Sequence, residues 1–239
     1  MNKKKNLTTK EMLVLALQHH KKNNLKIAEN LYKEILKTDP NHIDTHNNLG
    51  MIFKKLGEPQ RAISCYEKVI QIDSNYVDAH NNLGIVFKEL GEFQKAISCY
   101  EKTIQIDSNY AGAHNNLGVI FYELGKLKNA ISCYEKVIQI HPNYAGAYYN
   151  LGIVFNELGK RQKAISCYEK AIQIDPNYSE AYWNLHSLAS DTDDALTTLR
   201  KLYDIDNKFL KAKIMISALQ GFKGNFSDFD ALITPPESN

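Results

Sequence analysis

The sequence of 239 residues predicts an all-α solenoid of stacked helix–turn–helix units. A segment of 34 residues recurs along the chain: residues 43–76 and 77–110 match at 26 of 34 positions, and further copies occupy 111–144 and 145–178. A period of this length is typical of solenoids, in which each unit buries its apolar face against its neighbours. Each copy also contains two stretches of helical periodicity, separated by a glycine.

Weaker copies extend this array at both ends. Residues 9–42 keep the register without a gap, and residues 179–209 form a shortened copy that lacks three residues near Ser190. We expect a basic N-terminal tail over residues 1–8 and, over 210–239, a further degenerate repeat or helical cap with a short tail. The array over 9–209 then consists of the copies 9–42, 43–76, 77–110, 111–144, 145–178 and 179–209.

Within a copy, counted with Ile43 as position 1, positions 2–14 and 18–30 are predicted helices. A glycine at position 15 ends the first helix, because glycine most easily adopts the backbone of a tight turn. Each central copy ends in Asp-Ser-Asn, His-Pro-Asn or Asp-Pro-Asn, which supply helix-stop and capping groups. In the second helix, positions 20, 21, 24, 27 and 28 share one face and are predicted to form the core.

The recurring residues resemble the tetratricopeptide repeat (TPR) family. They are Leu49-Gly50, Phe53, Gly57, Ala62, Tyr66 and Asp73-Ser74, repeated in steps of 34. Departures from the family pattern are small; for example, Ser74 and Ser108 stand where the family usually has proline. The resemblance implies stacked helix pairs in a right-handed superhelix, with the first helices lining a concave side that binds polypeptides.

The first helix of each copy carries an unusual polar pattern on the face opposite its partner helix. Position 6 is asparagine in five successive copies, although asparagine is a mediocre helix former. A carboxamide offers both donors and an acceptor, so a ladder of them can pair with the backbone of an extended peptide. The candidate peptide-binding residues are Asn48, Asn82, Asn116, Asn150 and Asn184 at position 6, Asn47, Asn81 and Asn115 at position 5, and the apolar Met51, Ile85, Val119 and Ile153 at position 9.

This pattern resembles the asparagine ladder in the TPR region of O-linked N-acetylglucosamine transferases, which implies that the five position-6 residues hold a peptide backbone. Val14 and Met215 occupy position 6 in the end copies, so the ladder should stop there. Two alternatives remain open: the amides bond between adjacent helices and only stiffen the stack, or recent duplication copied them without a role. A carboxylate clamp of Lys and Arg is disfavoured, because positions 2, 5 and 6 of the central copies hold neither residue.

Cysteine and histidine also recur, which raises the question of a metal site. The four cysteines stand at one position per repeat, where neighbouring helices should hold them about 9–10 Å apart, too far for zinc or a disulfide. We therefore predict free thiols at Cys65, Cys99, Cys133 and Cys167. Histidine recurs at position 4 as His46, His80 and His114, and later copies have Tyr at this position. Replacement by Tyr favours a packing role over metal binding.

We predict a scaffold that binds a protein or peptide and is not an enzyme, since no phosphate loop, nucleophile elbow or dinucleotide fingerprint occurs and no cofactor is implied. The alternative is the substrate-recruiting region of a glycosyl-, sulfo- or methyltransferase system. A catalytic domain or second subunit is then a possible partner at the C-terminal end. The net charge of +2 gives no indication of binding to nucleic acid. No stretch approaches the ~18 apolar residues of a membrane helix, so no contact with a membrane is expected. A cytoplasmic location is the default expectation.

Overall fold

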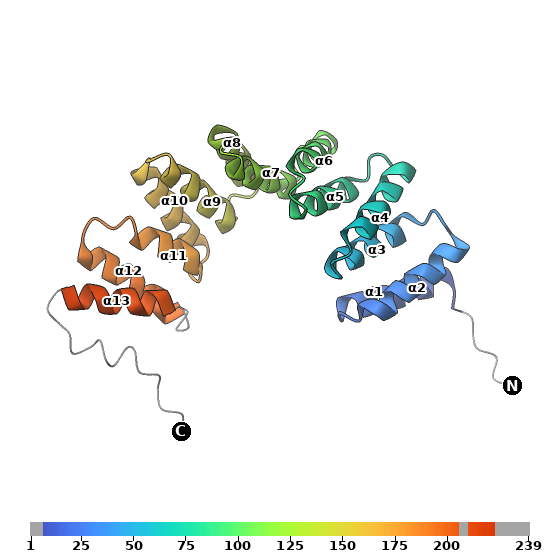
Figure 1. Cartoon of the computed structure of the whole chain (residues 1–239), viewed down its shortest axis with the longest axis horizontal. Coiled ribbons are helices and arrows are strands. Elements are labelled where there is room, and N and C mark those ends of the chain that lie inside the picture. Colours follow the sequence, from blue (N-terminus) through green and yellow to red (C-terminus); the bar gives the residue numbers. More distant parts are fainter. Residues whose placement is uncertain (1–6, 206–209, 223–239) are drawn as a thin grey trace, which may run out of the picture. The chain divides into compact units, whose positions relative to one another are not determined.

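The structure, a computed structural model, describes residues 7–205 and 210–222, and these ranges contain thirteen helices and no strand (Figure 1). This confirms the predicted all-α class. No helix within these ranges is long and apolar enough to cross a membrane. In chain order the helices are α1 (Thr9–Lys21), α2 (Leu25–Thr38), α3 (Ile43–Lys55), α4 (Pro59–Ile72), α5 (Val77–Glu89), α6 (Phe93–Ile106), α7 (Ala111–Glu123), α8 (Leu127–Ile140), α9 (Ala145–Glu157), α10 (Arg161–Ile174), α11 (Ser179–His186), α12 (Thr192–Ile205) and α13 (Leu210–Phe222).

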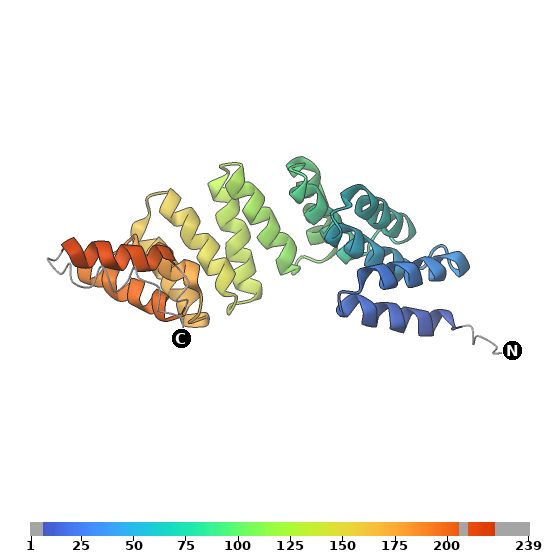
Figure 2. The ribbon, with the colours of Figure 1, turned by 60° about the horizontal axis from the view of Figure 1, so that its bottom comes forward.

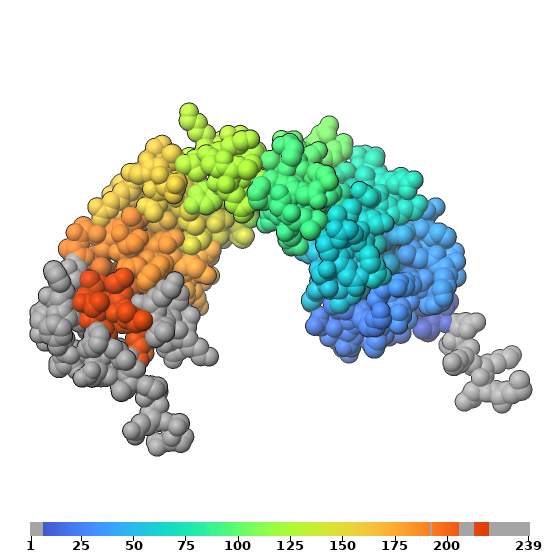
Figure 3. Space-filling view, viewed as in Figure 1, coloured from blue at the N-terminus to red at the C-terminus, as the bar shows by residue number. Residues whose placement is uncertain are grey.

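The chain divides into two compact units, residues 1–120 and 121–239. In the first unit, α1 packs on α2, α3 on α4 and α5 on α6, and α2 and α4 also contact the first helix of the next pair. The atoms of α1 to α4, coloured blue to cyan, form a continuous packed surface in Figure 3. In the second unit, α9 packs on α10, α11 on α12, and α13 on α12 (Figure 2). Within each unit, the repeats are therefore helical hairpins, and neighbouring hairpins pack on one another.

The glycine at position 15 makes the turn within the four central hairpins, while Asn23, with a φ of +62°, stands at this position between α1 and α2. Gly57 has a φ of +72°, and a Cβ atom placed on it would meet no heavy atom within 4 Å, so the backbone angle rather than space requires glycine. The Gly57 N–H donates to Lys54 O, and the Glu58 N–H donates to Phe53 O at 2.8 Å. These bonds satisfy the last carbonyls of α3, as in a Schellman-type helix end. The predicted helix break is confirmed.

In the hairpins α3–α4, α5–α6 and α9–α10, a tyrosine of the second helix packs against a glycine of the first. A Cβ atom on Gly50 of α3 would lie 2.6 Å from Cε1 of Tyr66 of α4, so only glycine allows the ring to lie this close. The Tyr66 side chain is fully buried, together with Ala62 and Val69 on the same face of α4. The buried face of the second helix is thus the one that its periodicity predicts.

The recurring histidines join a helix to the loop before it. The ring Nε2 atoms of His46, His80 and His114 lie 2.8–3.0 Å from backbone oxygens six residues earlier in the chain. Because a carbonyl can only accept, each Nε2 carries the proton and donates it. The histidines thus have a structural role, holding the loop between repeats.

The shortened repeat has a different connection. Helix α11 has eight residues where α9 has thirteen. The guanidinium Nη2 of Arg161, at the start of α10, donates to Leu188 O at 2.6 Å and to Ala189 O at 2.9 Å. The carbonyls just after the shortened helix have no intrahelical hydrogen-bond donor, and Arg161 therefore supplies one.

At the C-terminal end, α13 buries Ile216 and Ser217, while Ile214 and Met215 are exposed. Gly224-Asn225-Phe226, which we expect to continue this further repeat, lie outside the described residues. Whether 210–239 acts as a cap or as a docking segment for a catalytic domain or second subunit stays a prediction.

Candidate functional site

The first helices of the first unit carry the predicted asparagines and aliphatic residues at their surface. Asn48, Asn82 and Asn116 are all half-buried, and so are the position-9 residues Ile85 and Val119. The position-9 residue of the preceding repeat, Met51, is more open, with 41% of its surface exposed. Polar amides and apolar side chains therefore alternate on a partly open helical face, and such a composition is suited to binding an extended polypeptide.

The asparagines at position 5 are placed differently. Asn47 and Asn81 are only 9% and 7% exposed, so they lie between repeats rather than on the open face. The Asn82 Nδ2 atom donates to Asn47 Oδ1 at 3.4 Å, and these residues are 35 positions apart in the chain. The position-6 amide of one repeat thus bonds to the position-5 side chain of the repeat before it. At least this amide takes part in the helix-to-helix bonding that the sequence left open as an alternative.

The second unit contains the same connection with an aromatic acceptor. Its predicted residues Asn150, Ile153 and Asn184 are half-buried. The Asn184 Nδ2 atom donates to the hydroxyl of Tyr149 at 3.3 Å, again across 35 positions. The Tyr149 ring centroid lies 5.0 Å from that of Tyr178, and burial raises the pKa of Tyr149. Because position 5 changes here from asparagine to tyrosine, the surface becomes more apolar.

The first unit also contains tyrosine–aspartate contacts that the sequence analysis did not predict. The Tyr110 hydroxyl donates to Asp78 Oδ1 at 3.0 Å, and burial together with this bond raises the pKa of Tyr110 to about 12. The Tyr76 hydroxyl donates to Asp44 in the same way, at 3.2 Å. The sequence does contain a sign of this contact, because Asp recurs at position 2 and Tyr at position 34. The two residues are 32 apart in the chain, however, so the periodicity of a single helix does not reveal that they meet. An acidic pocket of about 480 Å³ adjoins these pairs, lined by Asp73, Asn75, Tyr76, Val77, Asp78, Asp107 and Tyr110.

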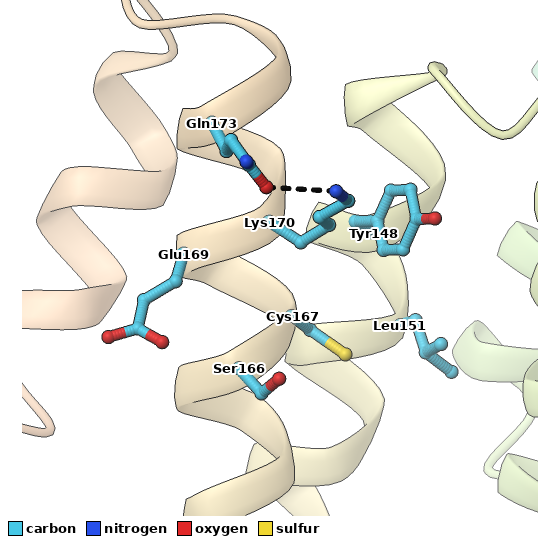
Figure 4. A pocket seen from close by; sticks show the side chains of 7 residues that line it. All are labelled: Tyr148, Leu151, Ser166, Cys167, Glu169, Lys170 and Gln173. Carbon is cyan, nitrogen blue, oxygen red and sulfur yellow. Dashed lines mark hydrogen bonds between the residues drawn. The ribbon is translucent and has the colours of Figure 1, made fainter.

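A second pocket, of about 510 Å³, opens between α9 and α10 (Figure 4). Tyr148, Leu151 and Cys167 contribute to its wall, and the Lys170 Nζ atom on its rim donates to Gln173 Oε1 at 2.8 Å. Burial raises the pKa of the Cys167 thiol to about 11. A thiol with this pKa is almost entirely protonated near neutral pH and is a poor nucleophile.

The other three cysteines share this environment. Burial raises the pKa values of Cys65, Cys99 and Cys133 to about 11 as well, and all four thiols are free. No group of three or more His, Cys, Asp or Glu side chains that could hold a metal ion occurs in the part of the chain that the structure describes. The four thiols are free in the structure, as predicted; those of Cys65, Cys99 and Cys133 are half-buried, and that of Cys167 is buried.

This environment predicts slow chemical modification of the native protein. With iodoacetamide near neutral pH, we expect the four cysteines to react much more slowly in the folded chain than after unfolding, when the pKa values return to about 8.5. Mass spectrometry of unreduced protein should show four added groups only in the denatured sample. Rapid labelling of the native chain, or zinc bound in stoichiometric amount, would contradict this.

Family models for tetratricopeptide repeats match the central copies. One, described as TPR repeat, matches residues 86–125 and 119–159. Two others, each described as Tetratricopeptide repeat, match residues 43–76 and 145–178 and residues 65–98. Together these matches cover residues 43–178 without a gap. Among curated protein sequences, none matches the chain significantly.

Solved structures show the same fold. The crystal structure of MamA is 29% identical, with a TM-score of 0.63 over 69% of this chain and 96% of MamA. PilF of Pseudomonas aeruginosa is 21% identical, with a TM-score of 0.74 over 90% of this chain and 96% of PilF. YrrB, described as a TPR protein with an unusual peptide-binding site, is 20% identical, with a TM-score of 0.60 over 76% of this chain and 95% of YrrB. The repeat matches, the hairpin fold and these similar structures agree: the chain belongs to the tetratricopeptide repeat family, whose members are scaffolds for protein–protein interaction.

Proposed function

We propose that the chain binds an extended polypeptide along the face formed by the first helices of its repeats. The observation that carries this proposal is the asparagine at position 6 of five successive copies, half-buried in each. An amide that is partly open to solvent can donate to a ligand carbonyl and accept from a ligand N–H. The ladder is similar to that of O-linked N-acetylglucosamine transferases, and YrrB, which shares the fold, is described as binding peptide.

The neighbouring side chains suit the same ligand. Met51, Ile85 and Val119 in the first unit and Ile153 in the second offer apolar contact without directional demands. Hydrogen bonds to a peptide backbone do not depend on the ligand's side chains, so the ladder would tolerate many sequences. In this proposal the chain has no catalysis of its own and requires no cofactor; it holds its partner in place.

The first test removes two ladder amides of the first unit. We expect the double substitution Asn48→Ala/Asn116→Ala to weaken peptide binding about tenfold or more, because each lost hydrogen bond is worth about 0.5–1.5 kcal/mol. The probe is a fluorescent peptide selected on the wild-type chain from a displayed library of random sequences. Its dissociation constant is measured by fluorescence anisotropy.

The matched control is Gln71→Ala/Gln105→Ala, which removes two exposed amides from the outward faces of α4 and α6. This control should bind the probe as tightly as the wild type does. If the asparagine variant keeps its affinity but melts at a clearly lower temperature, the amides only stiffen the stack and the proposal is wrong.

A further inference from the structure

The first helices of the second unit carry acidic side chains without basic ones. Helices α9 and α11 contain no Lys or Arg, and each carries one glutamate, Glu157 and Glu180. In the first unit, by contrast, α1 and α3 contain two lysines each. Glu180 is exposed, and none of the ion pairs among the described residues involves it. Its carboxylate is therefore available to a cation from outside the chain.

A tyrosine next to Glu180 lacks the acceptor that its counterparts use. In the first unit, the hydroxyls of Tyr76 and Tyr110 each donate to the aspartate at position 2 of their own repeat. In repeat 145–178 this position is Gly146, so the hydroxyl of Tyr178 has no such acceptor. The Tyr178 side chain is only half-buried. Its ring is thus partly open to solvent and is not held by the bond that fixes the equivalent rings.

Two further tyrosines lie at this end of α9. The ring centroid of Tyr149 is 5.0 Å from that of Tyr178, with 40° between the ring planes. A Cβ atom on Gly146 would lie 3.2 Å from Cζ of Tyr144, so glycine lets this ring, which is 46% exposed, lie against the helix. Burial and the charge of Glu180 raise the pKa values of Tyr149 and Tyr178, that of Tyr178 to about 12. The carboxylate therefore lies close to both rings.

We infer that the surface formed by Tyr144, Tyr149, Tyr178 and Glu180 binds an arginine side chain of the polypeptide partner. The planar guanidinium stacks on the open part of the Tyr178 ring by cation–π attraction, and it donates to the Glu180 carboxylate. Because α9 and α11 have no Lys or Arg, nothing on these helices repels it. The inference rests on the proposed function and adds the chemistry of the partner, which is recognised here by a charged side chain.

Selection of a displayed library of random peptides on the full chain provides the first measurement. We expect the peptides that bind the wild-type chain to share an arginine, and those selected on Glu180→Gln to lose this preference. Glu180 is exposed, so the substitution leaves the fold intact. The start of α11 carries a partial positive charge that favours anions, so glutamate enriched in place of arginine would overturn the inference.

The affinity of one selected peptide provides the second measurement. Its arginine is replaced by citrulline, which keeps the size of the side chain and removes the charge. On the wild-type chain this replacement should weaken binding about tenfold, as fluorescence anisotropy measures. On Glu180→Gln it should cost only about threefold, because the ring contact alone remains. The matched control is Glu135→Gln, which removes an exposed carboxylate of α8 and should leave the tenfold effect unchanged.

The ring contact is tested at Tyr178. Tyr178→Phe keeps the ring, so the arginine peptide should bind this variant as tightly as it binds the wild type. Tyr178→Leu, with its fold checked by circular dichroism, should reduce the tenfold difference between the arginine and citrulline peptides to about threefold. An undiminished difference on Tyr178→Leu would show that the guanidinium does not stack on this ring.

The outcomes separate the inference from the proposed function. If the selected peptides bind without a preference for arginine, or if citrulline costs the same on Glu180→Gln as on the wild type, only the inference fails. If the library yields no peptide that the wild-type chain binds, the proposed function fails and the inference fails with it.

Discussion

Replacing Gly50 with valine is expected to lower the free energy of unfolding by about 3 kcal/mol, at the upper end of the usual cost of overpacking a core. The added Cβ atom would lie 2.6 Å from Cε1 and 2.7 Å from Cζ of Tyr66, well inside van der Waals contact. The ring cannot move away easily, because Tyr66 is fully buried. Urea denaturation followed by circular dichroism measures the change.

A double variant tests whether the Tyr66 ring causes this loss. Tyr66→Ala alone should cost about 3–5 kcal/mol, because it leaves a cavity in the core. In the Gly50→Val/Tyr66→Ala chain the valine has room, so the two effects should fall short of their sum by about 2 kcal/mol. Additive losses would mean that Gly50 is required for its backbone conformation and not for the close approach of the ring.

The repeat made most of the fold predictable. A glycine every 34 residues predicts where the four central hairpins turn, and the positive φ of Gly57 confirms the reason. The spacing of Ala62 and Tyr66 predicts the buried face of α4, which the structure also has. Helix starts were less predictable: α3 begins at Ile43, one residue before the predicted start. The side chain of His42 caps this helix by accepting from the Thr45 N–H, and histidine is not a usual capping residue.

The candidate site was less predictable, because its contacts join different repeats. Helical periodicity describes which residues share a face of one helix, and on that basis Asn47 adds to the open face beside Asn48. In the structure, the next repeat covers Asn47 and supplies the Asn82 amide to it. The close approach of α3 and α5 depends on side-chain packing between residues about one repeat apart, which a pattern within one helix does not contain.

The same limit applies to a buried ionic cluster that the sequence reasoning did not anticipate. Glu29 of α2 is buried, and its carboxylate lies 2.7 Å from Lys33 Nζ, 3.0 Å from Arg61 Nη2 and 3.2 Å from Lys26 Nζ. Arg61 comes from α4 of the next repeat, and its guanidinium lies 3.7 Å from the centre of the Phe53 ring. A buried carboxylate is costly unless it is paired, so this cluster couples the first two repeats.

Acid should therefore destabilise the N-terminal repeats through Glu29. The hydrogen bond from Lys33, followed by those from Arg61 and Lys26, holds the pKa of Glu29 at about 2 although burial opposes this. Relative to an unfolded pKa of about 4.5, the shift corresponds to about 3 kcal/mol. Because the folded pKa is the lower one, this stabilisation is complete above pH ~4.5 and disappears as the pH falls toward ~2.

Glu29→Gln should remove this contribution, lowering the free energy of unfolding by about 3 kcal/mol near neutral pH and flattening its dependence on pH between about 5 and 2. The three cationic partners are all partly or largely exposed, so water can solvate them once the carboxylate is gone. The control is Glu34→Gln, which breaks the exposed pair with Lys37 and should cost no more than about 0.5 kcal/mol. Urea denaturation across this pH range decides: if the wild type and Glu29→Gln lose stability in parallel as the solution is acidified, Glu29 does not couple the first two repeats.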